Sequence, residues 1–345
     1  MSRSVPPAPS SPVDKSKRGR KEITPPQEVV ANSNTNTSRQ GRSTLRGHLD
    51  LLDPVTWVAG PQGFISGALA TGAITLDLRG MGLLVLGIIL TGPLLIGYSQ
   101  SINDFFDRDL DAVNEPTRPI PAGLVTLRGA ILNFSVVALL SLVVSILIGF
   151  VIGNGRADNG LVLLVMTILG LGLGTAYSAP PFEFKRNGMS GALSVGLGYN
   201  LMTWMMGNLA FAELRLNILV LGLLSASIAV GLIIMNDLKS IEGDRVLGLR
   251  TLPVTLGAQG ALLVAYFFID VSQAAFGVFM LVTGHYWIAA LQAVGLVVQI
   301  AAQPALSRNP TRDQFKRYLL IGNGPILLVA LLSALSFGWN WSAGW

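Results

Sequence analysis

The chain has 345 residues, of which 51% are hydrophobic and only 12% are charged. A soluble domain carries about 25% charged residues, so this composition excludes an ordinary soluble protein and predicts an all-α polytopic protein of the lipid bilayer. The chain has no Cys and only two His, which excludes disulfides, a thiolate metal site and a cysteine nucleophile. We expect no nucleic-acid partner.

Residues 1–44 differ from the rest of the chain. They are rich in Ser, Pro, Asn, Lys and Arg, and they lack an apolar run long enough for a signal-peptide core. We therefore expect a disordered cytosolic tail, followed by one membrane domain over 45–345.

Nine apolar stretches of the membrane domain have the length needed to cross a bilayer, about 17 to 25 residues. They predict nine transmembrane helices at 55–74, 81–102, 127–152, 160–178, 190–212, 216–236, 257–281, 285–305 and 318–338. Lys and Arg concentrate in cytosolic loops, and of the 24 such residues only Arg79, Arg156 and Arg215 fall in the loops after odd-numbered spans. The sequence therefore predicts a cytosolic N-terminus and a C-terminus on the opposite side.

Two acidic motifs end spans in the two halves of the chain: N-D-F-F-D-R-D-L-D at 103–111 and N-D-L-K-S-I-E-G-D at 236–244. Charges near lipid are costly and like charges repel, so such motifs need a cation to stabilise them. A basic residue and a Pro-containing block follow each motif at a similar distance, which indicates a weak internal repeat. We expect each half to bring one motif to a shared cavity on the cytosolic face.

If the helix continues past the second span, the first motif presents one polar stripe of residues that are three or four positions apart. That stripe consists of Asn103, Asp104, Asp107 and Asp111. In the second motif, Asp237 and Asp244 are seven residues apart, nearly two turns, and share a face if the helix persists. Gly243 leaves that condition open.

Oxygen ligands without His or Cys suit Mg²⁺, which is commonly held by a few carboxylates and by substrate phosphates. Two such clusters at one cavity predict Mg²⁺ ions that bridge a diphosphate, with nearby cations neutralising the remaining phosphate charge. The candidate cations are Arg118, Lys185, Lys239 and Arg250. This arrangement suits ionisation of an allylic diphosphate whose apolar tail lies in the bundle, away from water. The alternative is that each motif is only a solvated, salt-bridged helix end.

The motif N-D-x-x-D-x-x-x-D resembles the first signature of the UbiA superfamily of intramembrane aromatic prenyltransferases. Three further blocks resemble the chlorophyll and bacteriochlorophyll synthases of that superfamily: N-E-P-T-R-P-I-P-A-G at 114–123, Y-S-A-P-P-F-E-F-K-R-N-G at 177–188, and N-D-L-K-S-I-E-G-D-R-V-L-G-L-R-T-L-P-V at 236–254. The resemblance covers roughly 48–340. Relatives that prenylate the quinone precursor homogentisate tend to carry Asp where this chain has Ser240, which favours the chlorophyll branch.

The resemblance implies a UbiA-type bundle of nine helices with a central cavity. It also implies transfer of a geranylgeranyl, phytyl or similar group from its diphosphate to the propionate of chlorophyllide or bacteriochlorophyllide, the last step of (bacterio)chlorophyll biosynthesis. The implied setting is the cell membrane or a photosynthetic membrane, with protein partners from photosynthetic assembly. The first span departs from the family pattern, reading D-P-V-T-W-V-A where K-P-x-T-W-x-P is common.

The resemblance also assigns roles to individual residues. Those implied to bind Mg²⁺ and diphosphate are Asn103, Asp104, Asp107, Asp111, Asp237 and Asp244. Those implied to hold or orient the diphosphate are Arg118, Tyr177, Lys185 and Lys239, with Asn236 and Arg250 in the same substrate-binding set.

Asp270 lies inside the apolar run Y-F-F-I-D-V-S-Q-A-A, and an ionisable group within a membrane helix is a candidate functional residue. It either contacts the pigment substrate or braces the bundle through a hydrogen bond with Ser272 or a neighbouring span.

Two alternatives to the chlorophyll branch stay open. One is a prenyltransferase that acts on a quinone precursor. The other is a cation-coupled transporter, because internal repeats and membrane carboxylates also describe that class. Transporters bind near the bilayer midplane, whereas these carboxylates lie at helix ends, which favours an enzyme.

Overall fold

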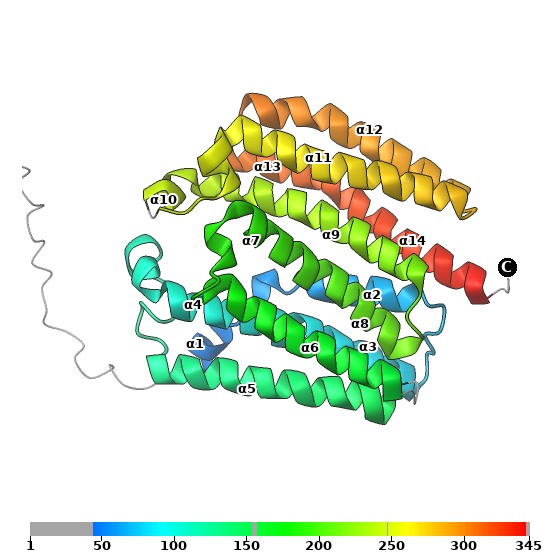
Figure 1. Ribbon diagram of the computed structural model, residues 1–345, viewed down its shortest axis with the longest axis horizontal. Helices are drawn as coiled ribbons and strands as arrows, with labels where there is room; N and C mark the ends of the chain where they lie inside the picture. The colour runs from blue at the N-terminus through cyan, green and yellow to red at the C-terminus, as the bar shows by residue number, and fades with distance from the viewer. Residues whose placement is uncertain (1–43, 154–156, 247, 343–345) are drawn as a thin grey trace, which may run out of the picture. The chain divides into compact units, whose positions relative to one another are not determined.

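Every regular element that the computed structural model describes is helical (Figure 1), which confirms the predicted all-α class. The structure describes residues 44–153, 157–246 and 248–342, so nearly all of the expected tail lies outside the described residues. The labelled helices are α1 Leu45–Asp50, α2 Ala59–Leu69, α3 Leu78–Ile89, α4 Leu95–Asn114, α5 Leu127–Ile146, α6 Ala157–Ser178, α7 Gly188–Val195, α8 Met202–Phe211, α9 Leu216–Asn236, α10 Ile241–Val246, α11 Leu252–Val282, α12 Tyr286–Arg308, α13 Arg312–Tyr318 and α14 Gly324–Ser342.

Short segments of tighter or wider helix connect several of these elements. The 3₁₀ segments are Pro54–Thr56, Phe184–Arg186 and Asp237–Ser240, and the π-helical segments are Leu90–Leu94, Leu147–Ile152, Gly196–Leu201 and Leu319–Asn323. Within α11, Gly257 has a φ of 72° and a ψ of 169°, so two helical pieces meet there. Only Gly adopts this backbone conformation without steric cost.

Polar residues fix the starts of several helices. The Asp77 side chain accepts a hydrogen bond from Gly80 N at 2.7 Å at the start of α3, and Thr126 accepts one from Gly129 N at 3.0 Å at the start of α5. Such caps satisfy backbone donors that have no partner inside the helix.

Six helices in the described part of the chain are long and apolar enough to cross a membrane. They correspond to six of the nine expected spans: Leu78–Ala112, Leu127–Ile152, Ala157–Ser178, Leu216–Val246, Leu252–Val282 and Tyr286–Arg308. The other three expected spans are helical but shorter or interrupted. The first is the 11-residue helix α2, the fifth has a π-helical segment between α7 and α8, and the ninth has one before α14.

Close backbone contacts hold α2 against α8. A Cβ added at Gly67 would lie 2.0 Å from Trp204 O, and one added at Gly207 would lie 2.0 Å from Phe64 O. Small residues allow this approach, which is how many membrane helices associate. Elsewhere α4 packs against α5 and α6, and α9 packs against α11, which also runs beside α12 (Figure 1).

The two acidic motifs differ in backbone structure. Helix α4 continues to Asn114, so the condition for one polar stripe is met and the whole first motif is helical. In the second motif the α-helix does not persist, because α9 ends at Asn236 and a 3₁₀ turn over Asp237–Ser240 leads into α10. The second motif therefore reaches its site through a change of helix type.

Candidate active site

The first residues of the two motifs line one internal cavity of about 410 Å³. Asn103 comes from α4, Asn236 from the end of α9, and Tyr177 from the end of α6. The cavity continues along the bundle to apolar side chains that include Leu95 and Met206. Residues far apart in the sequence are thus brought together where the two motifs begin.

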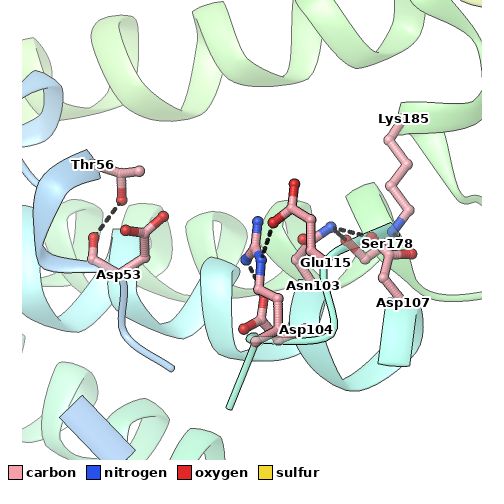
Figure 2. A network of polar contacts seen from close by, with 9 residues as sticks. Asp53, Thr56, Asn103, Asp104, Asp107, Glu115, Ser178 and Lys185 are labelled. Carbon is pink, nitrogen blue, oxygen red and sulfur yellow. Dashed lines mark hydrogen bonds and ion pairs between the residues drawn. The ribbon is translucent and has the colours of Figure 1, made fainter. Parts of the chain in front are cut away.

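Asp107 is the centre of a polar network that includes the cavity-lining Asn103 (Figure 2). Its Oδ2 accepts a hydrogen bond from Asn103 Nδ2 at 2.9 Å, and its Oδ1 lies 2.5 Å from Lys185 Nζ. Asn103 Nδ2 also donates to Ser178 Oγ at 3.1 Å. These bonds join α4 to the last residue of α6 and to the 3₁₀ segment that follows it, and they fix the orientation of the first motif.

The second motif lines an adjoining cavity of about 140 Å³. Its polar lining includes Asp237, Asp244 and the same Lys185 that contacts Asp107. Tyr177 lines this cavity as well as the central one. Lys185 and Tyr177 therefore connect the two motifs.

Two hydroxyl groups hold Asp244. Ser240 Oγ donates to Asp244 Oδ2 at 2.9 Å, and Thr251 Oγ1 donates to the same oxygen at 3.1 Å. Both bonds reach one oxygen, so the carboxylate is oriented, and among the described residues no hydrogen bond to Oδ1 is found. Asp244 itself is 8% exposed.

The buried Asp104 forms an ion pair with the partly exposed Arg118. The Asp104 side chain is 3% exposed, and Arg118 Nη1 lies 2.6 Å from Asp104 Oδ1. Arg118 Nε also donates to Glu115 Oε2 at 2.7 Å. Burial favours the neutral form of Arg118, but the hydrogen bond to Glu115 and the charge of Asp104 outweigh it and hold the pKa of Arg118 above its ordinary value. The other member of the stripe, Asp111, is part-buried on α4 one turn beyond Asp107.

Three predicted substrate-binding residues lie elsewhere. Lys239 lines a separate cavity with Lys316. The Arg250 side chain is exposed, and its backbone pairs with the segment at Asn187. Asp270 Oδ1 and Oδ2 accept hydrogen bonds from Gln303 Nε2 at 2.8 and 2.7 Å, and Oδ1 accepts a longer one from Gln299.

The contacts of Asp270 favour the bracing role over a substrate contact. Its partners come from α12 and not from Ser272, whose hydroxyl donates to Ser227 Oγ at 2.6 Å. We expect Asp270→Ala to lower the free energy of unfolding by about 1–3 kcal/mol, because it leaves amide donors without an acceptor, and to leave the KM values unchanged. Thermal unfolding in detergent and steady-state kinetics measure the two effects. A raised acceptor KM at unchanged stability would instead support the substrate role.

The donor set fits a hard divalent cation. Among the residues that the structure describes, no three Asp, Glu or His side chains form one group suited to hold a metal ion. Mg²⁺ retains several waters and is usually held by one or two carboxylates plus substrate phosphates, so it does not need a closed protein cage. Asp237 and Asp244 provide oxygen donors of that kind in the second-motif cavity. Lys185 lines the same cavity and contacts Asp107, which in turn accepts a hydrogen bond from Asn103.

The salt-bridged helix end accounts for only part of this geometry. Asp104 and Asp107 do pair with cations. Lys185, however, lies 78 residues from Asp107 in the chain and also lines the second-motif cavity. A local helix cap requires no such connection between the two halves.

The sequence did not single out Ser178, Thr251 or Tyr199, although each lies at the site. Ser178 bonds Asn103, Thr251 bonds Asp244, and Tyr199 lines the central cavity. Ser178 and Thr251 fall inside the blocks at 177–188 and 236–254, and this position is the sequence signal that could have identified them as site residues. Tyr199 lies in an apolar span and carries no such signal.

The fold and the site define a polytopic helical membrane protein with two acidic motifs at one internal cavity. The model of the UbiA prenyltransferase family matches residues 63–324. The chain therefore belongs to the UbiA prenyltransferase family, and it is an integral membrane enzyme that uses a polyprenyl diphosphate donor. The cation-coupled transporter alternative is accordingly wrong.

Similar proteins include chlorophyll synthases. The chain is 34% identical over 261 residues to the chloroplastic chlorophyll synthase of Avena sativa, covering 76% of this chain and 68% of that protein. It is 34% identical to the bacteriochlorophyll synthase 34 kDa chain of Chloroflexus aurantiacus, covering 77% and 82%.

Two solved structures share the fold. One is a digeranylgeranylglyceryl phosphate synthase, with a TM-score of 0.66 and 21% identity, covering 85% of this chain and 99% of that chain. The other is a UbiA homolog from Archaeoglobus fulgidus bound to GPP and Mg²⁺, with a TM-score of 0.61 and 21% identity, covering 84% and 99%.

Proposed function

We propose that this enzyme esterifies the propionate carboxylate of a chlorophyllide or bacteriochlorophyllide with a geranylgeranyl or phytyl group from the corresponding diphosphate. The similarity to chlorophyll and bacteriochlorophyll synthases supports the choice of acceptor. The proposal depends most on the position of Lys185. Its Nζ lies 2.5 Å from Asp107 Oδ1, and its side chain lines the cavity that Asp237 and Asp244 also line. A diphosphate bound to Mg²⁺ can occupy the space between two such motifs, because the carboxylates bind the metal and the lysine binds the phosphate oxygens.

The donor head would lie between the motifs. Asn103, Asp107, Asp237 and Asp244 would hold Mg²⁺, and the A. fulgidus homolog bound to GPP and Mg²⁺ supports the choice of a prenyl diphosphate and Mg²⁺ as ligands. Mg²⁺ supplies stabilisation of the negative charge on the diphosphate as it leaves. Lys185 would donate hydrogen bonds to the same group, and Tyr177, which faces both cavities, would orient it.

The reaction needs no strong general base. The bond from C1 of the prenyl group to the diphosphate oxygen breaks, and its electron pair leaves with the diphosphate. A carboxylate oxygen of the acceptor then forms a bond to C1 of the resulting allylic cation. A propionate is already ionised near neutral pH, so no proton has to be removed. The near absence of His agrees with this chemistry.

Apolar space beside the motifs suits the prenyl chain. A second cavity of about 320 Å³, lined by side chains such as Ile228, Leu232 and Phe276, shares Tyr199 and Ile233 with the central cavity. An allylic cation in such a site is shielded from water, which would otherwise capture it.

Removing the hydroxyls that orient Asp244 is expected to weaken Mg²⁺ binding. For Ser240→Ala and Thr251→Val we expect the Mg²⁺ concentration for half-maximal activity to rise about tenfold each, because outer-shell hydrogen bonds fix a metal ligand. Mg²⁺-dependent thermal stabilisation in the presence of prenyl diphosphate measures the same effect without turnover. Ser240→Thr, which keeps the hydroxyl, is the control. An unchanged Mg²⁺ dependence in all variants would show that these hydroxyls do not position a ligand.

The proposed function is tested by a substrate matrix. Purified enzyme with Mg²⁺ is given chlorophyllide, bacteriochlorophyllide or homogentisate, each with geranylgeranyl or phytyl diphosphate. We expect an ester of at least one of the two pigments and no prenylated homogentisate. Prenylation of homogentisate alone would instead place the enzyme in the quinone branch.

A further inference from the structure

A cavity of about 190 Å³ lies between the end of α9 and the loop that joins α12 to α13. We call it the two-lysine cavity, because Lys239 and Lys316 both line it. Lys239 belongs to the 3₁₀ turn of the second motif, and Lys316 belongs to α13. Asp237, two residues before Lys239, lines the second-motif cavity instead. Asp237 and Lys239 therefore line different cavities.

The charge of the two-lysine cavity is one-sided. No carboxylate is among the described residues that line it, and the other polar residues there are Asn236 and Thr311. Both lysine side chains are exposed at the rim. Two ammonium groups at the rim of one cavity favour an anionic ligand over a neutral or cationic one.

The floor of the cavity is apolar. Leu306 and Met235 are each 1% exposed, and the rest of the apolar lining comes from Leu238, Pro310, Phe315 and Leu319. A fully solvated anion such as free phosphate gains nothing from such a floor, whereas an anion on an apolar body does. The chemistry therefore favours an amphipathic acid from the membrane.

Asn236 joins this space to the reaction site. It lines both the two-lysine cavity and the central cavity, where Asn103 and Tyr177 lie. A ligand held by the lysines is thus one residue away from the space assigned to the donor. Pockets that enclose a whole drug-sized ligand measure about 300–1,000 Å³, so a cavity of about 190 Å³ takes a side arm and leaves a large ring outside.

We infer that Lys239 and Lys316 receive the carboxylate arm of the acceptor before it enters the central cavity. This inference rests on the proposed function, which supplies an acceptor with an ionised propionate on a large apolar ring. It separates two tasks among the basic residues. Lys185 serves the donor diphosphate between the motifs, and the two lysines serve the acceptor on the other side of Asn236.

The test compares KM values for the two substrates. For Lys239→Ala and Lys316→Ala, we expect the KM for chlorophyllide or bacteriochlorophyllide to rise about tenfold, because a charged hydrogen bond is lost. The KM for prenyl diphosphate is expected to stay within about twofold. Lys239→Arg and Lys316→Arg keep the charge and should stay close to wild type. The matched control is Arg317→Ala, because Arg317 neighbours Lys316 and is exposed, but is absent from the cavity lining.

A binding measurement gives a readout independent of turnover. Quenching of protein fluorescence by chlorophyllide and by its propionate methyl ester reports whether the carboxylate is recognised. We expect wild type to prefer the acid, and the double variant Lys239→Ala/Lys316→Ala to bind both alike. Equal preference in the two proteins would overturn the inference.

Other outcomes assign the lysines differently. A rise in the KM for the prenyl diphosphate alone would show that Lys239 binds the donor diphosphate and not the acceptor. An effect present in vesicles of anionic lipid and absent in vesicles of phosphatidylcholine would assign both lysines to lipid headgroups. If wild type esterifies neither pigment, the proposed function fails and the inference fails with it. If wild type is active and the lysine variants are unchanged, only the inference fails.

Discussion

Asp237→Asn is expected to lower kcat for prenyl transfer at least about a hundredfold while the protein stays folded. The substitution keeps the shape of the side chain and removes its negative charge. In the structure Asp237 lines the cavity that Lys185 and Asp244 also line, where charge on the leaving diphosphate would be neutralised. The measurement is single-turnover transfer of labelled geranylgeranyl groups at saturating Mg²⁺.

The second motif offers a matched control for this variant. Glu242→Gln makes the same change five residues further on, at a side chain that is 85% exposed and paired only with Arg245 at 3.2 Å in the described structure. We expect its kcat to stay within about twofold of wild type. The corresponding test of the first motif is Asp107→Asn. Its control is Asp109→Asn, since Asp109 is 88% exposed. Normal activity in both Asp237→Asn and Asp107→Asn would remove the diphosphate assignment.

The second large effect concerns stability. We expect Arg118→Leu to lower the free energy of unfolding by about 3–5 kcal/mol, because it leaves the Asp104 carboxylate buried without its cation. Asp104→Leu has a smaller cost, since Arg118 keeps Glu115 and is 31% exposed. The double variant should be more stable than the sum of the single changes implies, because neither charge is then left uncompensated. Unfolding of the purified proteins in one detergent measures all three.

An exposed ion pair provides the comparison. Arg186 Nε lies 2.6 Å from Glu183 Oε1, with the Arg186 side chain 58% exposed. We expect Arg186→Leu to change the free energy of unfolding by no more than about 1 kcal/mol. If Arg118→Leu is no more destabilising than Arg186→Leu, the Asp104–Arg118 pair does not carry the structural role assigned to it.

Much of the fold follows from local properties of the sequence. Long apolar runs predict the six long spans, and the four-residue spacing of Asn103, Asp107 and Asp111 predicts a polar stripe on a continuing helix, which α4 provides. Both depend on the residues of one segment alone. The sequence does not decide whether the α-helix is interrupted between Asn236 and Ile241, because that depends on how the second motif packs against neighbouring segments.

The site was predictable where chemistry and spacing agree, and not where a partner comes from a distant segment. The motifs indicated oxygen donors at a shared cavity, and Asn103 and Asn236 do line one. Their composition contained nothing to assign Lys185 to Asp107, or Lys239 to a different cavity from Asp237. The hydrogen bond of Asp270 could not be predicted for the same reason, because its partner Gln303 comes from another helix.

The most direct measurement of the central claim is a competition experiment with one donor. Purified enzyme receives geranylgeranyl diphosphate and Mg²⁺ together with equal amounts of chlorophyllide, bacteriochlorophyllide and homogentisate, and mass spectrometry identifies the products. We expect the geranylgeranyl ester of a pigment, formed only when Mg²⁺ is present and absent with Asp237→Asn. Prenylated homogentisate as the sole product, or ester formation by Asp237→Asn at the wild-type rate, would contradict the account.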